Sequence, residues 1–98
     1  GRNQTQMISY AECEFIIPTS HSLKEKRAVL QRMLTRTKQK FNVSISEIDH
    51  QDKWQRTRIA IVCVASSSDA SDRELTHAIH YLESNPEWER TETIREHL

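Results

Sequence analysis

Glycine is almost missing from this chain of 98 residues, which has one glycine, Gly1, and two prolines. With no glycine inside the chain, the sequence has no glycine-rich loop of the kind that cradles phosphates through its backbone. The same scarcity excludes collagen and low-complexity segments rich in proline and glycine. The composition is that of an ordinary globular chain.

Long apolar runs and a cysteine framework are missing as well. No stretch approaches the roughly 18 apolar residues of a membrane span, and no charged segment followed by an apolar one marks secretion. The two cysteines, Cys13 and Cys63, each lie inside an apolar strand pattern. Two such cysteines without a secretion signal favour free thiols in a reducing compartment. We expect a cytoplasmic protein with no membrane partner.

The length fits one domain, because a single compact core typically spans roughly 50–200 residues. The first six residues carry no hydrophobic pattern and precede Met7. We interpret residues 1–6 as an expression or processing remnant and residues 7–98 as a single domain.

The hydrophobic pattern predicts six elements in the order β-α-β-β-α-β. Apolar residues alternate with period two in the first strand, which Pro18 ends. Each helix is expected to begin at a capping box, Ser22 with Glu25 and Ser71 with Glu74. The predicted elements are a strand over 7–17, a helix from 23 to about 40, strands over 43–48 and 58–65, a helix from Ser71 that stops before Asn85, and a charged strand over 87–98.

Two right-handed βαβ crossovers joined by a hairpin define the ferredoxin-like α+β fold. This topology predicts a four-stranded antiparallel sheet in the order 4-1-3-2, with two helices on one face. The open face is expected to carry one apolar set of the third strand, either Ala60, Val62 and Val64 or Ile59, Ile61 and Cys63. Because such a patch is unfavourable on a monomer, we expect a homodimer or higher homo-oligomer through the open sheet face.

The charges balance in total but are separated along the sequence. Lysine and arginine number 14, and so do aspartate and glutamate. Between residues 20 and 40, seven basic residues stand against one acidic residue, and Lys53, Arg56 and Arg58 follow. From residue 69 to residue 98, eight acidic residues stand against three basic ones. A basic helix beside a basic loop is the electrostatic pattern expected of phosphate contact.

The predicted nucleic-acid-binding residues are basic side chains of the first helix and of the connection after the second strand, with one tryptophan: Lys24, Lys26, Arg27, Arg32, Arg36, Lys53, Trp54 and Arg56. Trp54 between cations resembles a residue that stacks on an unpaired base. Alternatives stay open. The basic helix could be a solvated face, or it could dock an acidic protein surface or the acidic tail of a second subunit. Trp54 could pack over the core rim or in a subunit interface. Lys26 falls in the apolar sector of the helix. Its long side chain could still reach solvent from the edge of that sector.

No arrangement of residues predicts a catalytic, cofactor or metal site. Glu12 and Glu14 are expected on one face of the first strand. Two carboxylates so placed could perform paired acid–base chemistry, or they could form ion pairs with Arg56 or Arg58. The acidic and histidine side chains of residues 49–52 lack the spacing of a structural zinc site, so we expect them to shape a turn. The sequence therefore predicts a protein that is not an enzyme.

The chain carries four ordered motifs: SLKEKR at 22–27, NVS at 42–44, DHQD at 49–52 and WQR at 54–56. Together they resemble the YlxP-like family, a group of small bacterial proteins of undetermined function. The resemblance implies a ferredoxin-like fold and self-association. Through the genes that neighbour its members, it also implies a context of transcription elongation and translation initiation. At residues 66–69 the sequence SSSD carries less charge than we expect for the family, so no basic contact is predicted there.

Charge pattern and resemblance together predict a non-enzymatic RNA- or ribosome-associated accessory protein. It is expected to contact phosphates through its basic first helix and the hairpin after the second strand. The alternative is a protein-interaction or oligomerisation module whose basic helix docks an acidic protein surface.

Overall fold

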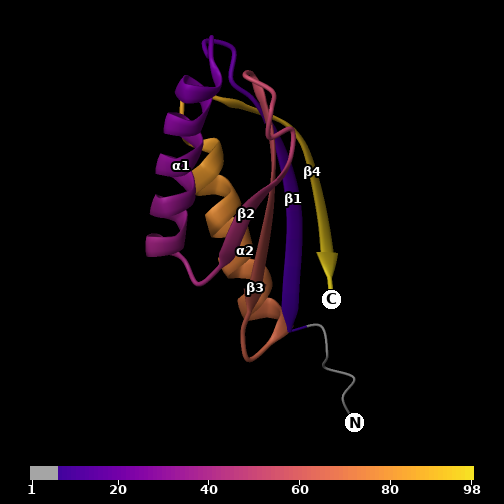
Figure 1. Ribbon diagram of the computed structural model, residues 1–98. Helices are drawn as coiled ribbons and strands as arrows, with labels where there is room; N and C mark the ends of the chain where they lie inside the picture. The colour runs from indigo at the N-terminus through magenta and orange to yellow at the C-terminus, as the bar shows by residue number, and fades with distance from the viewer. Residues whose placement is uncertain (1–6) are drawn as a thin grey trace.

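The computed structural model describes residues 7–98, so the predicted remnant at residues 1–6 lies outside the described residues. Six elements follow in the predicted order (Figure 1). They are β1 (Ile8–Ile16), α1 (Leu23–Lys40), β2 (Ser44–Asp49), β3 (Arg56–Val64), α2 (Ser68–Glu83) and β4 (Glu89–His97).

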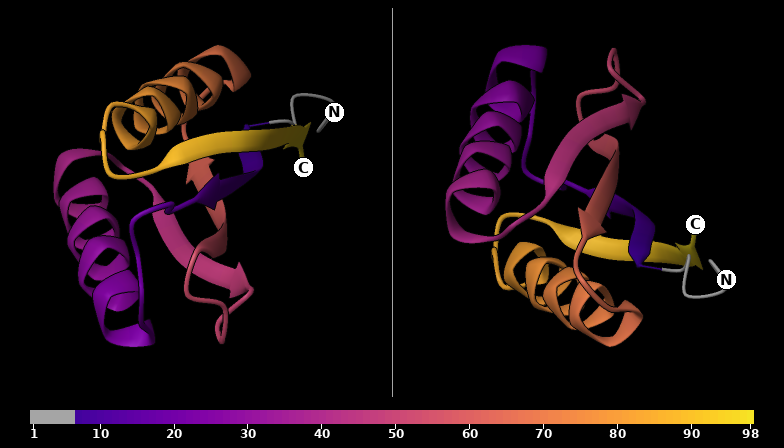
Figure 2. Two further views of the ribbon diagram at one scale, coloured as in Figure 1. Left: turned by 90° about the horizontal axis from the view of Figure 1, so that it is seen from above. Right: turned by 90° about the horizontal axis from the view of Figure 1, so that it is seen from below.

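The four strands form one antiparallel sheet in the order β2-β3-β1-β4. This is the predicted order 4-1-3-2 counted from the opposite edge, so the ferredoxin-like α+β fold is confirmed. Both helices cover one face of the sheet and leave the other open (Figures 1 and 2). The two central strands are β1 and β3, which place their side chains alternately in the core and on the open face.

The alternation along β3 decides which apolar set faces the helices. Ile59, Ile61 and Cys63 are buried in the core, at 0%, 1% and 2% exposure. Their neighbours Ala60, Val62 and Val64 consequently lie on the open face, because successive strand residues point to opposite sides. Burying each large apolar side chain stabilises the fold by about 1.5–3 kcal/mol, so this alternation fixes the register of the strand.

Helix α1 begins at the predicted capping box. The Oγ of Ser22 accepts a hydrogen bond from the backbone N–H of Glu25 at 3.1 Å, which satisfies one of the free amides of the first turn. Leu30, Met33 and Leu34 then pack against the sheet. The opposite side of the helix is exposed and basic, as its amphipathic pattern predicts.

Helix α2 begins earlier than predicted. Its N-cap is Ser67, whose side chain accepts from the backbone N–H of Ala70 at 3.1 Å. The predicted cap, Ser71, lies inside the helix, fully buried, and its hydroxyl hydrogen-bonds Ser9 Oγ at 2.8 Å. The prediction was wrong because both Ser67 and Ser71 are serines that could cap a helix. The hydroxyl of Ser71 instead hydrogen-bonds Ser9 on β1, so Ser67 is the N-cap.

The two cysteines are free and buried, as predicted. Burial raises the pKa of the Cys13 thiol and also that of the Cys63 thiol. A raised pKa lowers the thiolate fraction, so both behave as core side chains rather than nucleophiles. Of the helices that the structure describes, none has the length and apolar character to cross a membrane.

Candidate nucleic-acid interface

The exposed side of α1 carries cations that stay free of internal ion pairs. Lys24, Arg27 and Arg36, all predicted binding residues, are exposed. So are Lys38 and Lys40 near the end of the helix. Within residues 7–98, none of the five has a carboxylate oxygen within 4.0 Å. Their positive charge is therefore available to a partner, apart from Lys40, whose ammonium also lies 5.5 Å from the centre of the Tyr81 ring.

Lys26 does not belong to this surface, which corrects its assignment as a binding residue. Its side chain is fully buried, with Nζ 2.9 Å from Glu47 Oε2 and 2.5 Å from the carbonyl oxygen of His50. The hydroxyl of Thr57 donates to the same Glu47 oxygen at 2.6 Å. Lys26 was predicted to reach solvent, but Glu47 on β2 gives it an ionic partner inside the protein.

Arg32 also has an internal partner. Its guanidinium pairs with Glu87, in the connection between α2 and β4, and the side chain is half-buried. This contact joins residues far apart in the sequence, so no local pattern could reveal it. Arg32 is therefore a weaker candidate for phosphate contact than Lys24 or Arg27.

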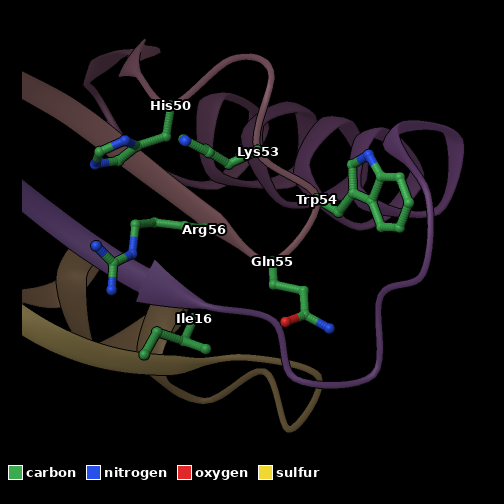
Figure 3. A pocket seen from close by; sticks show the side chains of 6 residues that line it. All are labelled: Ile16, His50, Lys53, Trp54, Gln55 and Arg56. Atoms are coloured by element: carbon green, nitrogen blue, oxygen red, sulfur yellow. The ribbon is translucent and has the colours of Figure 1, made fainter.

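The remaining predicted residues gather at the loop between β2 and β3, residues 50–55. Together with the adjoining ends of β1 and β3 this loop forms a pocket of about 620 Å³. We call it the hairpin pocket, and it is lined by Ile16, His50, Lys53, Trp54, Gln55 and Arg56. Figure 3 shows Trp54 on one side of it, His50 and Arg56 on the other, and Lys53 between them. The structure thus brings together the three predicted residues of this loop and strand.

The loop is held by a set of hydrogen bonds to its neighbours. The carbonyl oxygen of His50 accepts from Lys26 Nζ and, at 3.0 Å, from the backbone N–H of Lys53. The carbonyl oxygen of Gln55 accepts from the N–H of Ile17 at 2.9 Å, and the Gln55 amide donates to Ser20 O at 3.0 Å. His50 itself has φ of 65°, in the left-handed region that a tight turn requires. These bonds fix the pocket in relation to α1 and β1.

The two tryptophans differ in their surroundings. Trp88 is 3% exposed, stacks on Phe15 with ring centroids 4.3 Å apart, and donates from Nε1 to Leu82 O at 2.7 Å. Trp88 is therefore a core side chain. Trp54 is 54% exposed, and no aromatic ring is stacked on it within the described chain. It is not part of the core cluster, and the two structural alternatives for it, packing over the core rim or in a subunit interface, stay predictions.

Glu12 and Glu14 form ion pairs rather than an isolated carboxylate pair. Arg58 Nε donates to Glu12 Oε1 at 2.7 Å, and its Nη1 donates to Glu14 Oε1 at 3.1 Å and to Glu92 Oε2 at 2.7 Å. We call these four side chains the Arg58 cluster. This is the ion-pairing alternative foreseen for the two glutamates. Glu92 was missed, because its approach from β4 depends on the sheet order.

The Arg58 cluster shifts the titration of its members. Hydrogen bonds from Arg58 and then from Tyr10 lower the pKa of Glu12 below its ordinary value. Partial burial by itself raises the pKa of Glu14, but bonds to Arg58 and His50 outweigh it and the net shift is downward. The same contacts with Glu12 and Glu92 raise the pKa of Arg58 above its ordinary value. All three side chains are therefore held in their charged forms.

His50 joins the Arg58 cluster to the hairpin pocket. Its Nε2 lies 3.2 Å from Glu14 Oε1, and Asp49 Oδ1 accepts from its backbone N–H at 2.7 Å. Arg56 completes the link, with Nε 3.6 Å from Glu14 Oε2 while half of its side chain stays exposed. In residues 7–98 no three histidine, cysteine or acidic side chains are grouped so as to hold a metal ion.

The element order and sheet topology make this chain a ferredoxin-like α+β domain with a basic helix face and a pocket at one hairpin. A solved structure described as "De novo designed protein Foldit4" shares the fold, with a TM-score of 0.59 and 11% identity over 93% of this chain and 98% of that one. Residues 8–95 match the family "Protein of unknown function (DUF503)". The "Uncharacterized protein YlxP" of Bacillus subtilis (strain 168) is 56% identical over 90 residues, 92% of this chain and 98% of that protein. The chain belongs to this family, which confirms the resemblance of its four motifs.

Proposed function

We propose that this protein is a non-enzymatic RNA- or ribosome-associated accessory protein of the cytoplasm. The observation that carries the proposal is the position of its unpaired cations. Lys24 and Arg27 lie in the first turns of α1, at the end of the molecule where the β2–β3 hairpin also lies (Figure 1). Lys53 extends the same positive region onto the hairpin, and Arg56 lies beside it, half exposed and paired with Glu14 only through Nε at 3.6 Å. Cations without internal carboxylate partners are the groups that neutralise phosphates.

The mechanism is phosphate contact with release of counterions. Each phosphate that a lysine or arginine neutralises frees condensed cations, which makes the affinity fall as salt rises. The expected slope is about 0.7–0.9 log units per contact for each tenfold rise in salt. The site needs no catalytic group for this role, because binding itself is the function.

The test is the retention of ribosomal RNA on a filter over a series of salt concentrations. We expect a steep loss with salt for the wild type and a shallower slope for Lys24→Gln combined with Arg27→Gln. The matched control, Arg90→Gln combined with Arg95→Gln, removes the same charge from side chains paired with Glu83 and Asp72. The control should bind as the wild type does. A flat salt response, or equal losses in both variants, contradicts the proposal.

A second candidate is oligomerisation, favoured by the apolar half of the open sheet face. Ile8 and Val64 are directly paired neighbours and are 36% and 59% exposed, and Ile94 on the same face is 44% exposed. We propose that this patch binds a second copy of the chain, giving a homodimer or higher homo-oligomer. Sedimentation should then show a multimer that Val64→Lys reduces to monomer. An unchanged mass, or a monomeric wild type, contradicts it.

As an alternative to RNA, the basic helix would bind an acidic protein surface, either on another protein or on a second subunit. Charge removal at Lys24 and Arg27 separates the cases. If the multimer falls apart while RNA retention is unchanged, the helix serves subunit contact. If RNA retention is lost and the mass is unchanged, the helix serves RNA.

A further inference from the structure

We propose that the hairpin pocket binds one nucleotide unit, with the base stacked on Trp54 and the phosphate held by Lys53 and Arg56. The proposal rests on the proposed function and deepens it, because it names the part of an RNA that this end of the protein takes up. The general basic face of α1 would accept any phosphate backbone. The pocket would accept only a base that is not already stacked and paired in a duplex.

The size of the pocket suits such a ligand. Sites for small molecules in proteins typically enclose about 300–1,000 Å³, and the hairpin pocket measures about 620 Å³. One splayed-out nucleotide is of a size that such a pocket can hold. The lining combines an aromatic ring, an aliphatic side chain, an imidazole, two cationic side chains and an amide, which together suit the base and the phosphate of one nucleotide.

The aromatic side of the pocket is Trp54. More than half of its side chain is exposed, and within residues 7–98 no ring is stacked on it. A large apolar ring left open to solvent beside cations is the arrangement by which proteins stack unpaired bases. Trp88 shows the opposite case, since its ring is buried against Phe15 and its Nε1 is bonded to a backbone carbonyl.

The cationic side of the pocket is Lys53 with Arg56. Lys53 is exposed and has no carboxylate oxygen within 4.0 Å in the described part of the chain. Arg56 touches Glu14 only at 3.6 Å through Nε and keeps half of its surface exposed, so its terminal nitrogens are free to donate to a phosphate. In Figure 3 the side chains of Lys53 and Arg56 point to one side of the loop and the Trp54 ring points to the other, so base and phosphate would occupy opposite ends of the pocket.

Gln55 supplies the remaining polar group between the two ends. Its amide nitrogen is already bonded to the carbonyl oxygens of Ser20 and Pro18, at 3.0 and 3.2 Å. These bonds fix the orientation of the side chain and leave its Oε1 as an acceptor for an N–H of the base. Lys26 supports the site from behind through the carbonyl of His50. A site held in this way loses little order on binding, which favours affinity.

The first experiment measures tryptophan fluorescence while 5′-AMP, adenosine or inorganic phosphate is added to the full chain. Trp88 is buried and stacked, so a quenching signal reports Trp54. We expect saturable quenching by 5′-AMP and at least about fivefold weaker binding of adenosine, which lacks the phosphate. Lys53→Gln should remove most of that difference, whereas the matched control Lys38→Gln, an exposed cation near the far end of α1, should not. Absence of saturable quenching by 5′-AMP overturns the proposal.

The second experiment measures binding of single-stranded oligoadenylate and of a matched RNA duplex by fluorescence anisotropy. We expect Trp54→Ala to lower the affinity for the single strand roughly tenfold and to leave the duplex unchanged. Trp54→Phe, which keeps an aromatic ring, should restore much of the loss. An equal effect on both RNAs, or none on the single strand, overturns the proposal.

The two experiments separate this inference from the proposed function. If RNA retention depends on Lys24 and Arg27 but not on Trp54, the pocket proposal fails and phosphate contact by α1 stands. If 5′-AMP quenches Trp54 but no RNA is retained at low salt, the proposed function fails, and the nucleotide unit comes from a free nucleotide rather than from RNA.

Discussion

The half of the molecule built from α1 and the β2–β3 hairpin differs from the half built from α2 and β4 in how its charges are used. On α1, Lys24, Arg27 and Arg36 have no carboxylate within 4.0 Å in residues 7–98. In the other half Arg90 pairs with Glu83 at 2.8 Å and Arg95 pairs with Asp72 at 2.8 Å, whereas Arg73 on α2 is exposed and has no carboxylate partner within residues 7–98. The neutral total of the chain therefore hides a helix α1 on which most cations are free and a half built from α2 and β4 in which two of the three arginines are bound to carboxylates.

The proposed contact with an anionic partner rests on this difference. A cation already paired with a carboxylate gains little from a phosphate, because the new contact replaces an old one. A free cation gains the whole interaction and releases counterions from the phosphate. Two cations of α1 are exceptions to this comparison: Lys26 is paired with Glu47 and buried, and Arg32 is paired with Glu87.

The largest expected effect is on stability and concerns Lys26. Lys26→Met leaves Glu47 without its ionic partner at a site where that carboxylate is mostly buried, so we expect the free energy of unfolding to fall by about 3–5 kcal/mol. Urea denaturation measures the change. Lys24→Met, two residues away and exposed, should stay within about 0.5 kcal/mol of the wild type.

A second substitution tests the cause of that loss. Adding Glu47→Leu to Lys26→Met removes the orphaned carboxylate, and most of the stability should return. If the single variant is as stable as Lys24→Met, the two lysines do not differ as the structure indicates.

The next effect is smaller and depends on pH. Arg58→Gln leaves Glu12, Glu14 and Glu92 close together without their shared cation, so near neutral pH the free energy of unfolding should fall by about 1.5–3 kcal/mol. In the wild type the pKa values of Glu12 and Glu14 are lowered, so their stabilising effect is present above the ordinary glutamate pKa of 4.5. This stabilisation disappears as the pH falls through the lowered pKa values of the two glutamates.

Urea midpoints measured from neutral to acidic pH check this expectation. The gap between wild type and Arg58→Gln should be widest near neutral pH and should close in acid. A gap that stays constant with pH would show that the Arg58 cluster does not couple folding to these carboxylates.

The smallest effect on stability is expected at the hairpin pocket. Trp54→Ala removes a ring that is 54% exposed and unstacked, so the free energy of unfolding should change by less than about 0.5 kcal/mol. Trp88→Ala, measured in the same way, should cost about 3–5 kcal/mol because that ring fills the core against Phe15. Similar losses in the two variants would mean that Trp54 serves the fold rather than a ligand.

The fold could be predicted because its signals are local. Period-two alternation in β1, the capping box at Ser22 and the turn-forming segments gave the order of the elements, and handedness rules gave the sheet order. The start of α2 could not be predicted in the same way, since Ser67 and Ser71 offer similar caps. Contact between Ser71 and Ser9 on β1, which the sequence does not show, decided between them.

The candidate site was predictable only in part, for a related reason. Exposure of Lys24 and Arg27 follows from the helical period, and it could be foreseen. Burial of Lys26 depends on Glu47 from another element, and pairing of Arg32 depends on Glu87 from the far end of the chain. The pocket depends on bonds from residues 17–20 to Gln55, which bring the start of α1 and the hairpin together.

The most direct test of the central claim is ultraviolet crosslinking of the protein to RNA in cells, followed by sequencing of the RNA and identification of the crosslinked peptides. The free cations of α1 and the hairpin predict crosslinks in peptides that contain Trp54 or residues 23–36, and their loss in Lys24→Gln combined with Arg27→Gln. Crosslinks confined to α2 and β4, or no crosslinked RNA, would contradict the account.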